Sequence, residues 1–258
     1  MQTRAEVPQH ERPLTDPSIP TDALSLFFPM YNEEGNIDHA VTSALAVLAG
    51  VTDRYEVIVV DDGGRDRTGA IADRLAAANP RVRVVHHPVN RGYGAALRSG
   101  FAAATFPLVA FVDGDNQFDL GELSMLLRAM SPLAPSGVEG FDIVSGYRIA
   151  RHDPAFRRLY AFMYNRAMRL LFKIPVRDVN CGFKIYRRNL IERLLPQLRS
   201  TGALINVEML ARARKVGATV TEVGVHHYAR ETGQPTGGNP AVIVRAFREL
   251  VELWRELR

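Results

Sequence analysis

Residues 106–119 read Phe-Pro-Leu-Val-Ala-Phe-Val-Asp-Gly-Asp-Asn-Gln-Phe-Asp, and the rest of the chain can be interpreted around them. The apolar run 108–112 has the length of a buried β-strand and stops abruptly at an acid. Asp113 and Asp115 then flank Gly114. This pattern predicts two carboxylates at the carboxyl edge of a sheet, which is where open α/β sheets bind their ligands.

Two neighbouring carboxylates repel each other unless a cation lies between them. Mg²⁺ typically takes one or two carboxylates together with the phosphate oxygens of a substrate. Asp113 and Asp115 are therefore interpreted as a metal–diphosphate site. The alternative is a surface turn whose acids cap the next helix. Asp119, followed three residues later by Glu122, has the spacing of such a cap, whereas Asp113 and Asp115 come too early for that role.

Strand and helix patterns alternate through the first half of the chain. Apolar strands are expected at 24–28, 55–60, 82–85 and 108–112, with helical spacing at 37–48, from 67 onward, and at 92–100. Further strands are expected at 141–145, 182–186 and 220–225, and helices at 156–172, 207–216 and 241–257. This alternation predicts an α/β protein with a mostly parallel sheet and helices on both faces.

The two ends and one loop have distinct compositions. Residues 1–22 are polar and proline-rich and are predicted to form a flexible arm. Residues 23–258 are interpreted as a single domain that ends in an amphipathic helix. Residues 233–240 contain three glycines and two prolines, which predicts a mobile loop that closes over a ligand.

Composition is that of a soluble globular protein, with 47% hydrophobic and 23% charged residues in 258. No run approaches the roughly 18 apolar residues of a membrane span, and no signal peptide is recognisable. The one cysteine, Cys181, excludes an internal disulfide and fits a reducing compartment. Lys173, Lys184 and Lys215 are the only lysines among 32 basic residues. Arginine suits bidentate capture of phosphate.

A second acid pair, Asp61 and Asp62, follows the strand at 55–60. A carboxylate there can accept a hydrogen bond from a nucleobase N–H or a ribose hydroxyl. The two pairs together suggest a nucleotide, with its base near Asp61 and its diphosphate near Asp113. Taken alone, Asp61 and Asp62 are better explained as a turn with the two glycines that follow.

Residues 90–94, Asn-Arg-Gly-Tyr-Gly, partly match a dinucleotide-binding fingerprint. However, Leu97 stands where that fingerprint has its third glycine or an alanine, and the turn follows the third strand instead of the first. A nicotinamide-dependent oxidoreductase is therefore disfavoured.

Taken together, these and further motifs form an ordered series that resembles a known family, the inverting glycosyltransferases of family 2 with the GT-A fold. The series comprises residues 29–33 (Pro-Met-Tyr-Asn-Glu), Asp61-Asp62-Gly63 with Asp66 and Thr68, residues 90–94, and Asp113-Gly114-Asp115 with Gln117. In the second half, residues 145–148 (Ser-Gly-Tyr-Arg), the pair Arg157-Arg158 and residues 178–184 (Asp-Val-Asn-Cys-Gly-Phe-Lys) resemble the polyprenyl-phosphate, dolichol-phosphate mannose synthase-like branch.

The resemblance implies a role for each motif residue. The nucleobase and ribose pocket would be lined by Pro29, Tyr31, Glu33 and Asp61. The diphosphate and its Mg²⁺ or Mn²⁺ would be held by Asp113, Asp115 and Gln117. The acceptor phosphate would be bound by Arg148 and by Arg157 or Arg158, and Asp178 and Lys184 would stand near the reacting centre. Gly64 and Arg67 depart from the family pattern, which leaves the base unassigned.

The activity implied is transfer of a mannose- or glucose-type sugar from a GDP- or UDP-linked donor to a polyprenyl phosphate. A phosphate acceptor is already an anion and needs cations to hold it. A hydroxyl acceptor, which is the alternative, would need a base, and Asp178 is the residue expected to serve. Its other interpretation is a structural partner of a nearby arginine. A third hypothesis is an inactive nucleotide-sugar-binding subunit.

The helices at 156–172 and 241–257 combine large apolar with basic residues. This composition suits a membrane-surface helix, although a core helix with a solvated basic face is the commoner case. The expected location is cytoplasmic and peripheral on the inner face of the membrane, with or without a membrane-embedded partner. No nucleic-acid partner is expected.

Overall fold

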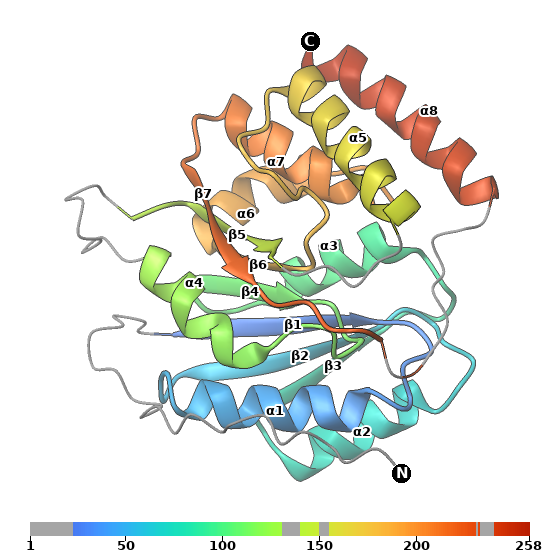
Figure 1. Cartoon of the computed structure of the whole chain (residues 1–258). Helices are drawn as coiled ribbons and strands as arrows, with labels where there is room; N and C mark the ends of the chain where they lie inside the picture. Colours follow the sequence, from blue (N-terminus) through green and yellow to red (C-terminus); the bar gives the residue numbers. More distant parts are fainter. Residues whose placement is uncertain (1–22, 131–139, 150–154, 231, 233–239) are drawn as a thin grey trace, which may run out of the picture.

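A computed structural model describes residues 23–130, 140–149, 155–230, 232 and 240–258, with only the backbone for 155–160 and 240–247. Its centre is one seven-stranded sheet (Figure 1). The strands, in spatial order, are β3 (Val82–His86), β2 (Tyr55–Asp61), β1 (Leu24–Met30), β4 (Leu108–Val112), β6 (Phe183–Arg187), β5 (Ile143–Arg148) and β7 (Val220–Val225).

All neighbouring strands are parallel except β6, which is antiparallel to both β4 and β5. The mostly parallel sheet predicted from the strand pattern is confirmed. Because β6 runs in the opposite direction, its first residue, Phe183, pairs with Val112 at the end of β4. The segment that precedes β6 is therefore brought to the edge of the sheet where β1, β2, β4 and β5 end.

Helices cover both faces of the sheet, also as predicted. One face carries α1 (Ile37–Ala49), α2 (Thr68–Ala78) and α4 (Leu123–Met130). The other carries α3 (Tyr93–Ala103), α5 (Ala155–Phe172), α6 (Arg188–Leu194), α7 (Ile205–Lys215) and α8 (Pro240–Leu257). Short 3₁₀ turns, η1 (Leu120–Glu122) and η2 (Leu195–Gln197), complete the structure.

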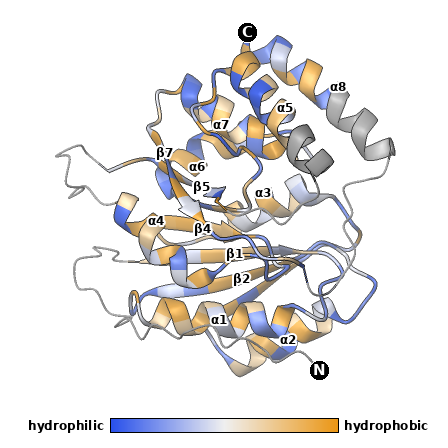
Figure 2. Ribbon diagram, in the orientation of Figure 1, coloured by the Kyte–Doolittle hydropathy of each residue, from blue (hydrophilic) through white to orange (hydrophobic). Residues whose placement is uncertain are grey.

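The central strands are buried on both faces, which explains their continuous apolar sequences. In β2, Ile58 and Val60 belong to the core beneath α3, and Val57 and Val59 to the core beneath α1. Figure 2 shows the resulting hydrophobic strands β1, β2 and β4.

Several element boundaries differ from prediction, and one short helix was not predicted. Strand β1 continues through Pro29 to Met30, because pairing with β4 stops at Phe27 and the missing N–H of Pro29 costs no bond on that side. Strand β5 includes Arg148, which was expected to follow the strand. Helix α6 was not predicted, since its seven residues are too few to show helical periodicity. Residues 1–22, the predicted flexible arm, and residues 233–239, most of the loop that was predicted to be mobile, lie outside the described residues.

Candidate active site

Asp113 is held at the end of β4 by two other segments. Its backbone N–H donates to the carbonyl of Gly182 (2.9 Å), and its Oδ1 accepts from the Tyr93 hydroxyl (2.8 Å). A Cβ atom on Gly182 would lie only 1.8 Å from Asp113 Oδ2. Glycine is therefore required at position 182 so that the segment before β6 can close against this carboxylate.

The electrostatics of the acid pair favour a bound cation. Burial and the negative charge of Asp115 together raise the pKa of Asp113 to about 7. Burial also raises the pKa of Asp115. Arg148 lies close enough to both acids for its charge to oppose these shifts, but not to cancel them. A divalent cation with substrate phosphate oxygens would complete the neutralisation.

Arg230 bridges Asp115 and Glu33. Its Nη2 donates to Glu33 Oε1, and its Nη1 lies 3.7 Å from Asp115 Oδ2. Glu33, in the loop after β1, also accepts from the Asn36 amide (2.5 Å), and burial raises its pKa. Sequence reasoning missed Arg230. Its only sequence signal is a basic residue just before the glycine-rich loop, whereas the acids that it contacts are 197 and 115 positions away.

Gln117 anchors the segment that carries Arg230. Its side-chain Nε2 donates to the carbonyl of Tyr228 (2.8 Å), and its own carbonyl accepts from the Tyr228 N–H (2.8 Å). His227 packs edge-on against Phe118, with ring centroids 5.0 Å apart. The structure thus shows Gln117 as an anchor, and its role as a metal ligand stays a prediction.

Arg148 and Asp178 form a bidentate ion pair across the same edge. Arg148 Nε and Nη2 donate to the two Asp178 oxygens at 2.7 and 2.8 Å, and the side chains are only 14% and 8% exposed. Although burial alone would lower it, this pairing raises the pKa of Arg148. A carboxylate engaged by two charged N–H donors is a poor base. The structure therefore shows Asp178 as a partner of Arg148, and its predicted catalytic role stays a prediction.

Lys184 is buried beneath the site instead of lining an open surface. It has 0% exposure, and its Nζ donates to the Cys181 carbonyl and to Asn206 Oδ1 (3.2 Å). Burial lowers its pKa. Its positive charge is still felt by Asp113, where it lowers the pKa. Lys184 can thus stabilise the acid above it, while its predicted catalytic role stays untested.

The second acid pair has its own partners. Asp61 accepts from the N–H of Gly64 (3.3 Å), and its Oδ2 lies 3.0 Å from His86 Nδ1. The other ring nitrogen of His86 lies 2.9 Å from Asp73. The hydrogen bond to Asp73, reinforced by Asp61, raises the pKa of His86. Asp61 is therefore a fixed acceptor, and its contact with a nucleobase or ribose stays a prediction.

Asp62 organises the turn at residues 90–94. It accepts from His87 Nδ1 (2.6 Å) and from the backbone N–H groups of Arg91 and Gly92 (both 2.9 Å). A Cβ on Gly94 would lie 2.5 Å from the carbonyl oxygen of Ser200. The motif's glycines thus serve close packing within the protein, which explains the partial dinucleotide fingerprint without a bound dinucleotide.

The loops that follow β1 and β2 are joined by polar contacts. Arg65 N–H donates to Asn32 Oδ1 (2.7 Å), and Arg67 Nε donates to Glu34 Oε2 (3.1 Å). Arg67, one of the two departures from the family pattern, thus braces the loop after β1. This is the loop that contains Tyr31 and Glu33, and Pro29 lies just before it in β1, so the three predicted nucleotide contacts lie within one short segment.

The predicted acceptor-binding arginines are only partly described. Arg148 is placed as above, whereas the side chains of Arg157 and Arg158, at the start of α5, lie outside the described residues. Further along α5, the apolar side chains of Phe162, Met163 and Leu170 are exposed, Leu170 by 69%. In the part of the chain that the structure describes, no helix is long and apolar enough to span a membrane.

The side chains at this sheet edge suit a metal ion that also binds a substrate diphosphate better than a metal ion held by protein side chains alone. Within the described ranges, no group of three or more His, Cys, Asp or Glu side chains is arranged to hold a metal. Two carboxylates on one short turn, with raised pKa values, match the site of a cation that takes its other ligands from a diphosphate. Asp113 and Asp115 therefore fit Mg²⁺ or Mn²⁺.

Comparison with known proteins identifies the class. Residues 25–195 match the model of glycosyl transferase family 2, and the chain belongs to this family. It is 32% identical over 219 residues to polyprenol monophosphomannose synthase of Mycolicibacterium smegmatis, covering 83% of this chain and 80% of that protein. It is also 32% identical over 244 residues to glycosyltransferase AglD of Haloferax volcanii, covering 91% of this chain and 37% of that protein.

A third relative is the undecaprenyl-phosphate 4-deoxy-4-formamido-L-arabinose transferase of Shewanella sediminis, 30% identical over 220 residues. That match covers 84% of this chain and 62% of the relative, so the chain spans less than two thirds of this protein and of AglD. The predicted resemblance to family 2 and to transferases named for polyprenyl-phosphate chemistry is confirmed.

Solved structures confirm the fold. Glucosyl-3-phosphoglycerate synthase from Mycobacterium tuberculosis, in complex with Mn²⁺, uridine diphosphate and phosphoglyceric acid, superposes with a TM-score of 0.66. The match covers 90% of this chain and 78% of that one at 21% identity. The fold class expected from the motifs is therefore the one observed.

Proposed function

We propose that this chain transfers a hexose from a GDP- or UDP-linked donor to a polyprenyl phosphate, with inversion at the anomeric carbon. The observation that carries the proposal is the partly buried Asp113–Asp115 pair, with raised pKa values, close to the Arg148–Asp178 ion pair. An acidic and a cationic group thus share one sheet edge. The first suits a metal–diphosphate and the second an anionic acceptor.

On the donor side, Asp113 and Asp115 would hold Mg²⁺ or Mn²⁺. When bound, the metal would neutralise the charge that develops on the departing nucleoside diphosphate. The chain's own residues do the positioning. Tyr93 orients the Asp113 carboxylate, and Arg230 joins Asp115 to Glu33. Asp61, with Pro29 and Tyr31, would contact the nucleobase and ribose.

On the acceptor side, Asp178 fixes the plane of the Arg148 guanidinium. Nη1 of Arg148 is not used by Asp178 and can donate to a phosphate. The phosphate would itself be the nucleophile, so no base is needed. A hydroxyl acceptor would need Asp178 as base, and its bidentate pairing makes it unsuited to that task. The printed names of the relatives from Mycolicibacterium and Shewanella support the lipid acceptor.

A lipid acceptor implies work at a membrane surface. The exposed Phe162, Met163 and Leu170 of α5, beside the exposed Arg166 and Arg169, are suited to the interface between acyl chains and headgroups. We therefore propose peripheral attachment on the cytoplasmic face, alone or through a membrane-embedded partner.

The test supplies labelled GDP- and UDP-sugars with polyprenyl phosphate in liposomes or with a panel of soluble hydroxyl acceptors. Arg148→Ala should impair transfer to the lipid and leave nucleotide affinity nearly unchanged. Arg177→Ala is the matched control, since Arg177 is 65% exposed and pairs with Glu222 instead of Asp178. Robust transfer to a soluble hydroxyl, with none to the lipid from any donor, would overturn the proposal.

A further inference from the structure

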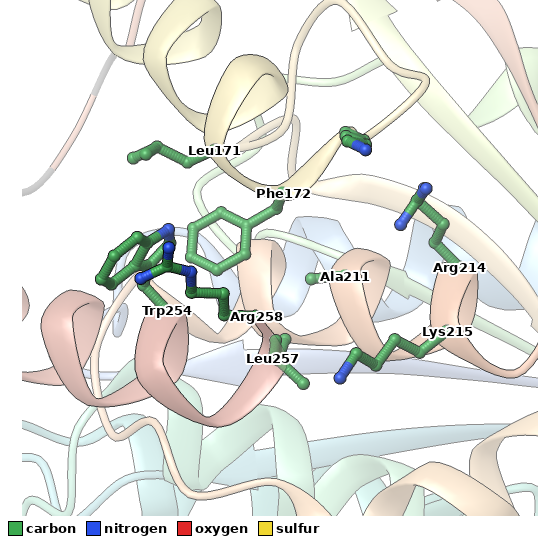
Figure 3. Close-up of a pocket in the computed structure, with 9 residues that line it drawn as sticks. Leu171, Phe172, Ala211, Arg214, Lys215, Trp254, Leu257 and Arg258 are labelled. Atoms are coloured by element: carbon green, nitrogen blue, oxygen red, sulfur yellow. The ribbon is translucent and has the colours of Figure 1, made fainter.

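A cavity of about 240 Å³ lies at the far end of α5, where α5, α7 and α8 meet (Figure 3). Its wall is apolar and is formed by Leu171, Phe172, Ala211, Trp254 and Leu257. Its remaining lining residues are all basic, namely Lys173, Arg214, Lys215 and Arg258. The combination of an apolar wall and a cationic rim suits an amphiphile with an anionic head.

The four cations of this rim are available to a ligand. All are exposed, and none forms an ion pair with any residue that the structure describes. The Arg258 guanidinium lies 5.0 Å from the centre of the Trp254 ring, so it is held over the cavity wall. Glu256, an acid on the last turn of α8, is engaged by Arg212 (2.9 Å) and does not neutralise the rim.

The surroundings of the cavity indicate where the ligand comes from. Leu171, in the wall, is 45% exposed, and its neighbour Leu170 is 69% exposed. These side chains continue the apolar surface that begins at Phe162 and Met163 on the same helix. The 18 residues of α5 span roughly 26 Å. The cavity is therefore well separated from Arg157 and Arg158 at the other end, and it is not the predicted acceptor site.

We propose that this cavity binds the phosphate headgroup of an anionic membrane phospholipid, with the first part of an acyl chain against Trp254 and Leu171. The proposal rests on the membrane-surface function above, and it adds a second lipid contact that orients the enzyme without taking part in transfer. The four cations would hold the phosphate, and the apolar wall would exclude a fully hydrated inorganic anion.

Trp254 is the only tryptophan of the chain and lines the cavity, so its fluorescence reports occupancy. The full chain is titrated with vesicles of phosphatidylcholine, with vesicles of equimolar phosphatidylcholine and phosphatidylglycerol, and with inorganic phosphate. Only the mixed vesicles should shift Trp254 emission to shorter wavelength. The double variant Arg214→Gln/Lys215→Gln should weaken that binding by about tenfold or more.

The matched control is Arg193→Gln/Arg199→Gln, which removes two exposed charges outside the cavity and should weaken binding by less than about threefold. Lys173→Gln should give a smaller loss in the same direction and replaces the double variant if that variant does not fold. Equal losses in both double variants, or an equal emission shift with inorganic phosphate or with phosphatidylcholine alone, would overturn the proposal.

A second assay distinguishes failure of the phospholipid-binding proposal from failure of the proposed transferase function. It measures sugar transfer to polyprenyl phosphate in neutral detergent micelles, which contain no anionic phospholipid. Arg214→Gln/Lys215→Gln should keep wild-type turnover there, because neither residue belongs to the active site. If the wild type shows no transfer, the proposed function fails, yet the vesicle titration still decides the cavity, since it contains no acceptor.

Discussion

One acid pair follows β2 and another follows β4, two strands that β1 separates in the sheet, and the two pairs have different surroundings. Asp61 and Asp62, after β2, are each engaged by a histidine and by backbone N–H groups. Asp113 and Asp115, after β4, keep raised pKa values. The same sequence pattern thus produces two acids that hold neighbouring loops in place after β2, and two acids whose negative charge is only partly compensated after β4.

The difference arises from what lies next to each strand. Strand β2 pairs in register with β3, so that Asp61 lies beside His86, and His87 follows to reach Asp62. Strand β4 instead meets the amino end of β6, where Gly182 and the buried Lys184 lie. Acids supplied with hydrogen-bond donors are structural, whereas acids that lack sufficient compensating charge are suited to a metal.

The largest effect should come from Asp115→Asn. Removing one charged metal ligand should lower transfer by about 1,000-fold, equivalent to roughly 4 kcal/mol. The assay follows sugar transfer during a Mn²⁺ titration. Normal turnover in this variant, or in the wild type with excess EDTA, would show that the acid pair after β4 does not hold a metal needed for transfer. Asp62→Asn is the control and should leave the dependence on Mn²⁺ unchanged in the folded fraction.

Asp62→Ala should mainly affect folding. It leaves His87 and two N–H groups without their acceptor, so the free energy of unfolding should fall by about 3 kcal/mol in urea denaturation. Asp73→Ala should cost less than about 1 kcal/mol, because Asp73 is 65% exposed. Similar losses in the two variants would show that Asp62 does not hold the neighbouring loop in place.

Asp61→Ala tests whether Asp61, besides its structural contacts, also contacts the nucleotide of the sugar donor. Loss of a buried acceptor should weaken binding of a nucleoside diphosphate by roughly 1–3 kcal/mol in calorimetry. Asp73→Ala removes the other partner of His86 and should leave that affinity nearly unchanged. Unaltered affinity in Asp61→Ala, with the fold intact, would reduce Asp61 to a purely structural residue.

Asp113→Asn should stabilise the metal-free protein while preventing metal binding. Because the pKa of Asp113 is raised from 3.8 to about 7 in the folded state, the folded protein holds a proton that the unfolded chain has already released. This favourable contribution to stability is present below about pH 4 and is lost as the pH rises to about 7.

At pH 8 the Asp113→Asn variant should therefore melt at least about 2–4 °C higher than the wild type, the shift that 1 kcal/mol gives at this chain length. At pH 4 the gain should be smaller. Excess Mn²⁺ should raise the melting temperature of the wild type only. A variant that is equally or less stable at pH 8 would show that Asp113 is not electrostatically strained.

The sequence by itself determined the sheet strands, the helices on both faces and the acids at the sheet edge. Strands buried on both faces must be continuously apolar, and a strand that ends in acids must end at a solvent or ligand boundary, so these features are visible locally. Asp61, Asp113 and Asp115 follow this local pattern, whereas family 2 was predicted from the resemblance of the whole ordered series of motifs. Short elements such as α6, and the passage of β1 through Pro29, left no such local pattern.

Only the tertiary structure decided which charged groups are partners. Arg148 meets Asp178 across 30 positions, and Arg230 meets Glu33 across 197. His86 reaches Asp61 through strand register. Electrostatic and hydrogen-bond energies depend on distance and burial in space, and a local sequence pattern carries neither. For this reason the family resemblance could suggest a position for Asp178 near the reacting centre, but the sequence could not show that Asp178 pairs with Arg148. The sequence also assigned no role to Arg230.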